Sequence, residues 1–183
     1  MAEYYLISQL PSLDGIGENT PIPITEERFM ELCGRFLGEK TFSEIENLTL
    51  VPSVISEKTS SVLIDNWNDG ERKLRLALGK ARADKINKSF DLHNNNLPIE
   101  LHKVASAAIE IENPLEAENF LLKHRINFLE TLRPMDNFSQ DFIYYYGLKL
   151  KLILRIRQFD TKLGEATYKN IYNSILSGDR LEA

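Results

Sequence analysis

The chain has 183 residues, of which 43% are apolar and 27% charged, and this composition excludes a largely disordered protein and allows a sizeable core. The one cysteine, Cys33, cannot form an internal disulfide, so we interpret it as a core thiol in a reducing compartment. The N-terminus lacks the pattern of a signal peptide, and no apolar run is long enough to span a bilayer. We therefore expect a cytoplasmic protein.

The net charge of −5 is unevenly distributed along the chain. Residues 1–65 carry eleven acids against four lysines and arginines, whereas residues 66–90 carry seven lysines and arginines against three acids. A third stretch, residues 149–157, carries four cations and no acid. This asymmetry predicts either ion pairing inside the protein or a charged docking face.

The N-terminal segment is ambiguous. Residues 4–10 are apolar and aromatic, and the run is too short for periodicity to separate a strand from a helix. A turn-rich loop over residues 11–23 follows. Thr25 is then expected to cap a helix that stops near Gly38.

Two helices are expected before the middle of the chain. Thr41 and Glu44 have the spacing of a capping box and predict a short helix to about residue 48. A long helix over about 60–86 is indicated by residues that recur every three or four positions, namely Leu63, Trp67, Gly70, Leu74, Leu78 and Ala81. Gly70 weakens the middle of this helix and predicts a kink. Residues 91–98 break the pattern and are the best internal boundary in a single helical domain spanning 1–183.

The second half continues with helices. A short helix is expected over 101–108, a longer one from the Asn113 cap to about 132, another from about 139 to 160, and a last one over 164–176. The alternating apolar and basic residues of 148–152 are typical of a strand, but leucine, lysine and arginine favour a helix there. The predicted fold is all-α, built of packed antiparallel helical hairpins, with a short N-terminal strand as the alternative for residues 4–10.

No catalytic motif accompanies these elements. The phosphate loop, the dinucleotide-binding glycine pattern, the nucleophile elbow and the zinc-protease helix are all missing from the sequence. His93, His102 and His124 do not have the spacing of metal ligands. We therefore expect a protein that is not an enzyme, with no catalytic residue, cofactor or metal site, and that acts by binding other proteins.

The basic stretches supply candidate docking residues: Arg72, Arg75, Arg82, Lys151 and Arg155. The basic face of residues 72–88 could also follow a nucleic-acid backbone, but the protein is acidic overall and has no recognised nucleic-acid-binding motif. We expect no nucleic-acid partner and keep that function as an alternative, beside a face that is merely solvated and self-paired.

The sequence resembles a bacterial family encoded within V-type ATPase operons. The similarity lies in NPLEAE at 113–118, RINFLE at 125–130, IYYYGLKLKLILR at 143–155, and the opening YYLISQLP at 4–11. That family is distantly similar to the C subunit of V-type ATPases, known in eukaryotes as the d subunit, an all-helical repeat protein between the membrane rotor ring and the central stalk. The segments KLRLALGK at 73–80 and KLKLILR at 149–155 look like two copies of its leucine and arginine pattern.

The resemblance implies an accessory or structural subunit of a V-type ATPase, similar to a truncated form of that C subunit. The expected partners are stalk or ring subunits, and the protein would lie at the inner face of the cell membrane only through them. A helical adaptor unrelated to the ATPase is the alternative.

Overall fold

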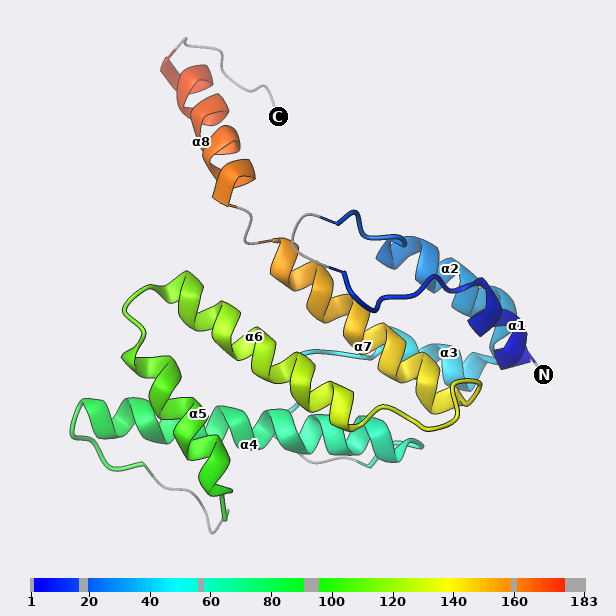
Figure 1. Ribbon diagram of the computed structural model, residues 1–183, viewed down its shortest axis with the longest axis horizontal. Coiled ribbons are helices and arrows are strands. Elements are labelled where there is room, and N and C mark those ends of the chain that lie inside the picture. The colour runs from blue at the N-terminus through cyan, green and yellow to red at the C-terminus, as the bar shows by residue number, and fades with distance from the viewer. Residues whose placement is uncertain (1, 17–19, 56–57, 91–95, 159–160, 177–183) are drawn as a thin grey trace.

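The computed structural model describes residues 2–16, 20–55, 58–90, 96–158 and 161–176, and these ranges contain helices and no strand. The all-α prediction is therefore confirmed (Figure 1). The helices in chain order are α1 (Ala2–Gln9), α2 (Glu26–Phe36), α3 (Glu39–Glu46), α4 (Val62–Lys85), α5 (Ile99–Glu110), α6 (Pro114–Thr131), α7 (Gln140–Arg157) and α8 (Thr161–Leu176).

Local capping chemistry accounts for the start of several helices. The side chains of Thr25, Ser61 and Ser139 each accept a hydrogen bond from a backbone N–H in the first turn of α2, α4 and α7. Asn113 does the same for α6, with Pro114 at the first helical position. Four boundaries thus follow from residue types that the sequence displays.

Three expectations need correction. The N-terminal segment is helix α1, so the strand alternative for residues 4–10 is wrong. The Thr41–Glu44 capping box does not form, because α3 already begins at Glu39, and Glu44 instead accepts a hydrogen bond from the Tyr144 hydroxyl. Helix α4 runs through Gly70 without interruption, and the ring of Phe128 occupies the space that a Cβ atom would need, which accounts for a glycine at this position.

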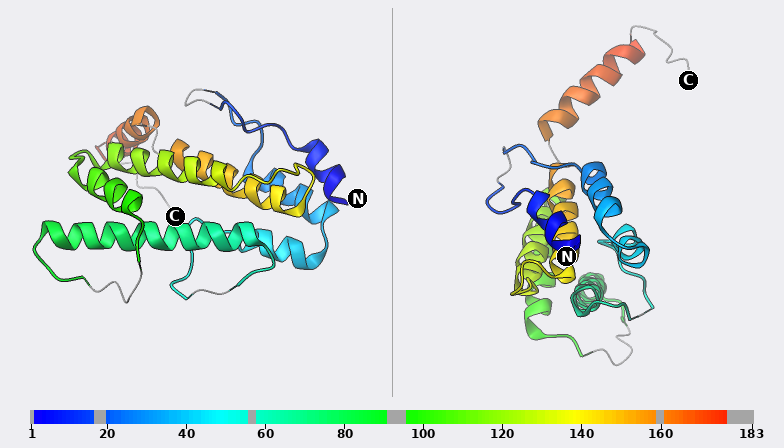
Figure 2. Two further views of the ribbon diagram at one scale, coloured as in Figure 1. Left: turned by 60° about the horizontal axis from the view of Figure 1, so that its bottom comes forward. Right: turned by 90° about the vertical axis from the view of Figure 1, so that its right-hand side faces the viewer.

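Helix α7 lies at the centre of the fold. It forms an antiparallel hairpin with α6, and its other sides pack against α1, α2 and α4 (Figures 1 and 2). Residues 143–150 are all buried, including the three rings of Tyr144, Tyr145 and Tyr146, although rings that point in three directions on a helix are not expected to be buried together. The alternating segment 148–152 is helical, as predicted, and the surrounding helices bury both its apolar and part of its basic side chains.

Two apolar clusters share α4 and α6. The larger one gathers α1, α2, α3 and α7 around the first half of α4, where Trp67 is 1% exposed. The smaller one joins the second half of α4 to α5 and α6 through Leu74, Leu78 and Leu121. The expected boundary at 91–98 lies between α4 and α5, and its residues 91–95 are outside the described ranges.

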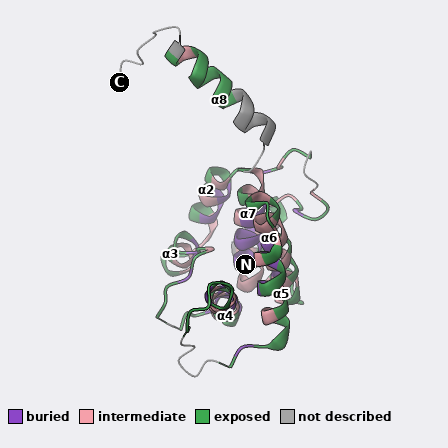
Figure 3. Cartoon of the chain, turned by 90° about the vertical axis from the view of Figure 1, so that its left-hand side faces the viewer, coloured by how far each residue is buried: buried purple, intermediate pink, exposed green. Residues whose placement is uncertain are grey.

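Helix α8 differs from the others in its exposure. It extends away from the other helices in Figure 1 and in the right-hand view of Figure 2, and the burial colouring shows its described part as mostly exposed (Figure 3). Its predicted apolar stripe is 51–71% exposed, at Tyr168, Ile171, Tyr172 and Ile175. Among the described residues, no helix combines the length and apolarity that crossing a membrane requires.

Candidate functional site

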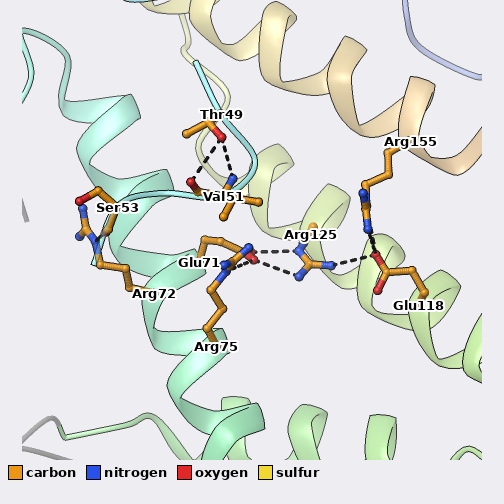
Figure 4. Close-up of polar contacts among 9 residues, drawn as sticks. All are labelled: Thr49, Val51, Ser53, Glu71, Arg72, Arg75, Glu118, Arg125 and Arg155. Atoms are coloured by element: carbon orange, nitrogen blue, oxygen red, sulfur yellow. Dashed lines mark hydrogen bonds and ion pairs between the residues drawn. The ribbon is translucent and has the colours of Figure 1, made fainter. Parts of the chain in front are cut away.

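A buried carboxylate lies in the middle of α4. Glu71 is only 2% exposed, and the guanidinium of Arg125 on α6 donates to both of its oxygens, each at 3.0 Å. Arg75, one turn further along α4, donates from Nε to Glu71 Oε1 at 3.1 Å (Figure 4). Two cations thus compensate a charge that would otherwise be costly to bury.

The network continues from Arg125 to α7. Arg125 Nη1 lies 3.9 Å from Glu118 Oε1, and Arg155 on α7 donates to the same oxygen from Nε at 3.1 Å and Nη2 at 3.0 Å. Arginines and glutamates therefore alternate from Arg75 to Arg155, and together they join α4, α6 and α7 (Figure 4).

These groups line a cleft of about 230 Å³, which we call the arginine cleft. Its walls come from the loop after α3 and from α4, α6 and α7: Leu50, Val51, Arg75, Glu118, Leu122, Arg125, Leu152 and Arg155. The loop is fixed by a hydrogen bond from Val51 N–H to Thr49 Oγ1 and by one from Arg72 Nε to the carbonyl of Ser53, each 3.0 Å long. The fold thus holds three guanidinium groups around a partly apolar space.

A second cavity, of about 390 Å³, lies beyond Glu71 and Arg125, and both residues line it. Its other lining is largely apolar and includes Leu74 and Phe128. The side chain of His124 also lines this cavity. Burial, and then the neighbouring charge of Arg125, lowers the pKa of His124, so this imidazole is neutral at pH 7. A neutral imidazole beside the network adds a polar group to this cavity without adding charge.

A second charged cluster surrounds Lys149 on α7, which is 7% exposed. Its ammonium group donates to Asp14 at 2.5 Å, to Glu130 at 2.7 Å and to the Tyr145 hydroxyl at 3.1 Å. Burial alone would lower the pKa of Lys149, but these hydrogen bonds outweigh burial and raise it. The cluster ties the loop after α1 to α6 and α7.

The five predicted docking residues do not form one surface. Arg75 and Arg155 meet at the arginine cleft, Arg72 holds the loop at Ser53, and Lys151 pairs with Glu26. Arg82 lines a separate cavity of about 310 Å³ between α4, α5 and α6, and it forms no ion pair with the described part of the chain. Most of the predicted docking charge is therefore engaged within the protein.

Three further lysines of the basic stretch are also engaged. Lys73 pairs with Asp69, Lys80 with Asp84, and Lys85 donates to the carbonyl of Ile109. This internal pairing is one of the two interpretations that the uneven charge distribution allows. Within residues 72–88, ion pairs thus involve Lys73, Arg75 and Lys80, whereas the ammonium group of Lys85 contacts an uncharged carbonyl.

Sequence reasoning misses the centre of the network. Arg125 is not among the predicted docking residues, and neither is Glu71, whose spacing in the sequence identifies it only as a helix partner of Arg75. A glutamate on the apolar side of a helix, one turn after Trp67 and three residues before Leu74, is the available signal for a buried carboxylate. Cys33 is buried as expected, and burial raises the pKa of its thiol to about 12, so it is not a nucleophile at neutral pH.

No group of histidine, cysteine, aspartate and glutamate side chains in the described ranges has the geometry of a metal site. Comparison of the chain with protein-family models, with curated proteins and with solved structures found no match.

Proposed function

We infer that the protein is an accessory or structural subunit that docks onto a V-type ATPase and performs no chemistry of its own. The observation that carries this proposal is the exposed apolar stripe of α8, four large side chains that are each at least half exposed. The resemblance of residues 113–118, 125–130 and 143–155 to proteins encoded in V-type ATPase operons supports the choice of partner. On this proposal the chain works at the cytoplasmic face and reaches the membrane only through its partners.

Physical chemistry favours α8 as the docking element. Apolar side chains at successive three- and four-residue spacings form one helix face, and an exposed face of this kind is the usual ligand of a hydrophobic groove or of another helix. The stripe Tyr168, Ile171, Tyr172 and Ile175 has this spacing, and the rings of Tyr168 and Tyr172 stack with centroids 6.1 Å apart. Burying it against a helical stalk subunit would remove its apolar area from water.

Affinity capture tests the proposal. The tagged protein is incubated with detergent-solubilised membranes from the same cell, and the captured proteins are identified by mass spectrometry. The double substitution Ile171→Asp and Ile175→Asp places charge on the apolar stripe, whereas Asn170→Asp adds charge to the neighbouring exposed position of the same helix as a control. Circular dichroism checks that both variants keep their helices.

We expect the wild-type chain and Asn170→Asp to recover ATPase subunits and the double variant to lose them. Failure of the wild-type chain to recover any ATPase subunit would overturn the proposal. Capture of an unrelated protein that depends on the same stripe would favour the alternative of a helical adaptor outside the ATPase.

A further inference from the structure

We propose that the arginine cleft binds a small phosphate-class oxyanion. This inference goes beyond the docking function and does not depend on it. It rests on three guanidinium groups that converge from α4, α6 and α7 on one space of about 230 Å³. Two carboxylates among the described residues, Glu71 and Glu118, form ion pairs with these guanidinium groups.

Hydrogen-bond donors outnumber acceptors in this network. A guanidinium group carries roughly five N–H donors. Arg75 uses Nε for Glu71, and its two terminal nitrogens make no hydrogen bond with the described part of the chain. Arg125 directs Nε and Nη2 to Glu71, whereas its Nη1 is 3.9 Å from Glu118, beyond hydrogen-bonding distance. Donors are thus left over at the lining of the cleft.

The cleft is accessible to solvent, but part of its lining is apolar. The side chains of Arg75 and Arg155 are 41% and 44% exposed, whereas that of Arg125 is 13% exposed. An anion can therefore enter from solvent past the two outer arginines and reach the inner one. Leu50, Leu122 and Leu152 provide apolar lining, which lowers the local dielectric and strengthens charge-assisted hydrogen bonds.

The number of arginines and the size of the cleft define the ligand class. A carboxylate has two oxygens, which one guanidinium fork can satisfy, whereas a tetrahedral phosphate offers oxygens in several directions to arginines from three helices. Sites for drug-sized ligands and nucleotides occupy roughly 300–1,000 Å³, so a cleft of this volume suits a single phosphate group instead of a nucleotide.

Isothermal titration of the full chain with inorganic phosphate, at constant ionic strength and pH 7, tests the proposal. We expect saturable binding of one phosphate per chain, competed by sulfate, which has the same shape, and not by acetate at the same concentration. Arg155→Gln removes an outer charge and should weaken phosphate binding about tenfold, the effect of losing about one charge-assisted hydrogen bond.

Arg75→Gln is the second variant, and Glu71 keeps both hydrogen bonds from Arg125 in it, so the buried carboxylate stays paired. Arg28→Gln is the matched control, since Arg28 is a half-exposed arginine that pairs with Glu31 on α2 and does not line the cleft. Absence of saturable phosphate binding by the wild-type chain would overturn the proposal. Binding that both cleft variants retain at wild-type strength would overturn it as well.

Discussion

The Lys149 cluster and the arginine cleft both combine cations with carboxylates, but they differ in how completely the N–H donors of the cations find acceptors. At Lys149, two carboxylates and a hydroxyl give the ammonium group an acceptor for each of its N–H bonds, and the lysine is buried. At the cleft, Arg75 and Arg125 both donate to Glu71, and further N–H groups of these two arginines make no hydrogen bond with the described part of the chain and lie next to an open space. The first arrangement is closed and can only stabilise the fold, whereas the second retains binding capacity.

This difference shows why charge counts along a sequence do not identify a binding site. Lys149, Lys151 and Arg155 belong to one basic stretch of α7, yet the first two are paired with acids from the N-terminal part of the chain. Only Arg155 points to the cleft, where Glu118 must serve both it and Arg125. The balance of donors and acceptors in three dimensions decides the role of each cation.

The largest effect is expected at Glu71. Glu71→Gln removes the charge that accepts two hydrogen bonds from Arg125, whose side chain is 13% exposed, and leaves this poorly solvated cation with only the more distant Glu118 at 3.9 Å. We predict a loss of about 3 kcal/mol in the free energy of unfolding, measured by urea denaturation. Glu31→Gln is the control, because Glu31 also pairs with two arginines but is 53% exposed. Equal losses in the two variants would contradict the buried network.

Lys149→Met should cost somewhat less. The substitution leaves Asp14 and Glu130 without their shared cation, but both carboxylates retain access to water, at 56% and 37% exposure. We predict a loss of about 2 kcal/mol in urea denaturation, less than the roughly 3–5 kcal/mol expected for a fully buried pair. Lys151→Met, which breaks the more exposed pair with Glu26, should cost less. A larger loss at Lys151 than at Lys149 would refute the closed-cluster description.

The Lys149 cluster also predicts a dependence of stability on pH. The hydrogen bond from Lys149 lowers the pKa of Asp14, and at Glu130 burial opposes, but the bonds from Lys149 and Tyr145 outweigh it and lower the pKa as well. Because both folded pKa values lie below the unfolded ones, the stabilisation is complete above about pH 5 and is lost as pH falls through the folded values. Denaturation in acid should show a shallower pH dependence in Lys149→Met, and an unchanged slope would count against the cluster.

The smallest effect on stability is expected at Arg155. Its side chain is 44% exposed and its partner Glu118 also has Arg125 nearby, so Arg155→Gln leaves no buried charge unpaired. We predict a change below about 1 kcal/mol in the free energy of unfolding. A substantially larger loss would show that Arg155 has a structural role like that of Lys149.

Local signals make much of the fold predictable. The caps at Thr25, Asn113 and Ser139 act on the residues immediately after them, so a few neighbouring residues determine where each of these helices starts. The helical state of residues 148–152 follows from residue propensities despite the alternating pattern. The N-terminal helix is not predictable because its segment is shorter than the window that periodicity needs.

Ion pairs between residues far apart in the chain cannot be predicted from this sequence. Arg125 and Glu71 lie 54 positions apart, and only the packing of α6 on α4 brings them together. The sequence shows that Arg75 and Arg155 are basic, but it cannot show that they face one cleft. The burial of Tyr144, Tyr145 and Tyr146 together is likewise unpredictable, since it requires helices on several sides of α7.

The most direct test of the contrast between the two charged regions is thermal unfolding at increasing phosphate concentration and constant ionic strength. A ligand that binds only the folded chain raises the unfolding temperature, and the rise grows with its binding free energy. We predict that Lys149→Met starts at a lower temperature and rises with phosphate as much as the wild-type chain. Arg155→Gln should start near the wild-type temperature and rise less. A full phosphate response in Arg155→Gln together with its loss in Lys149→Met would contradict the account.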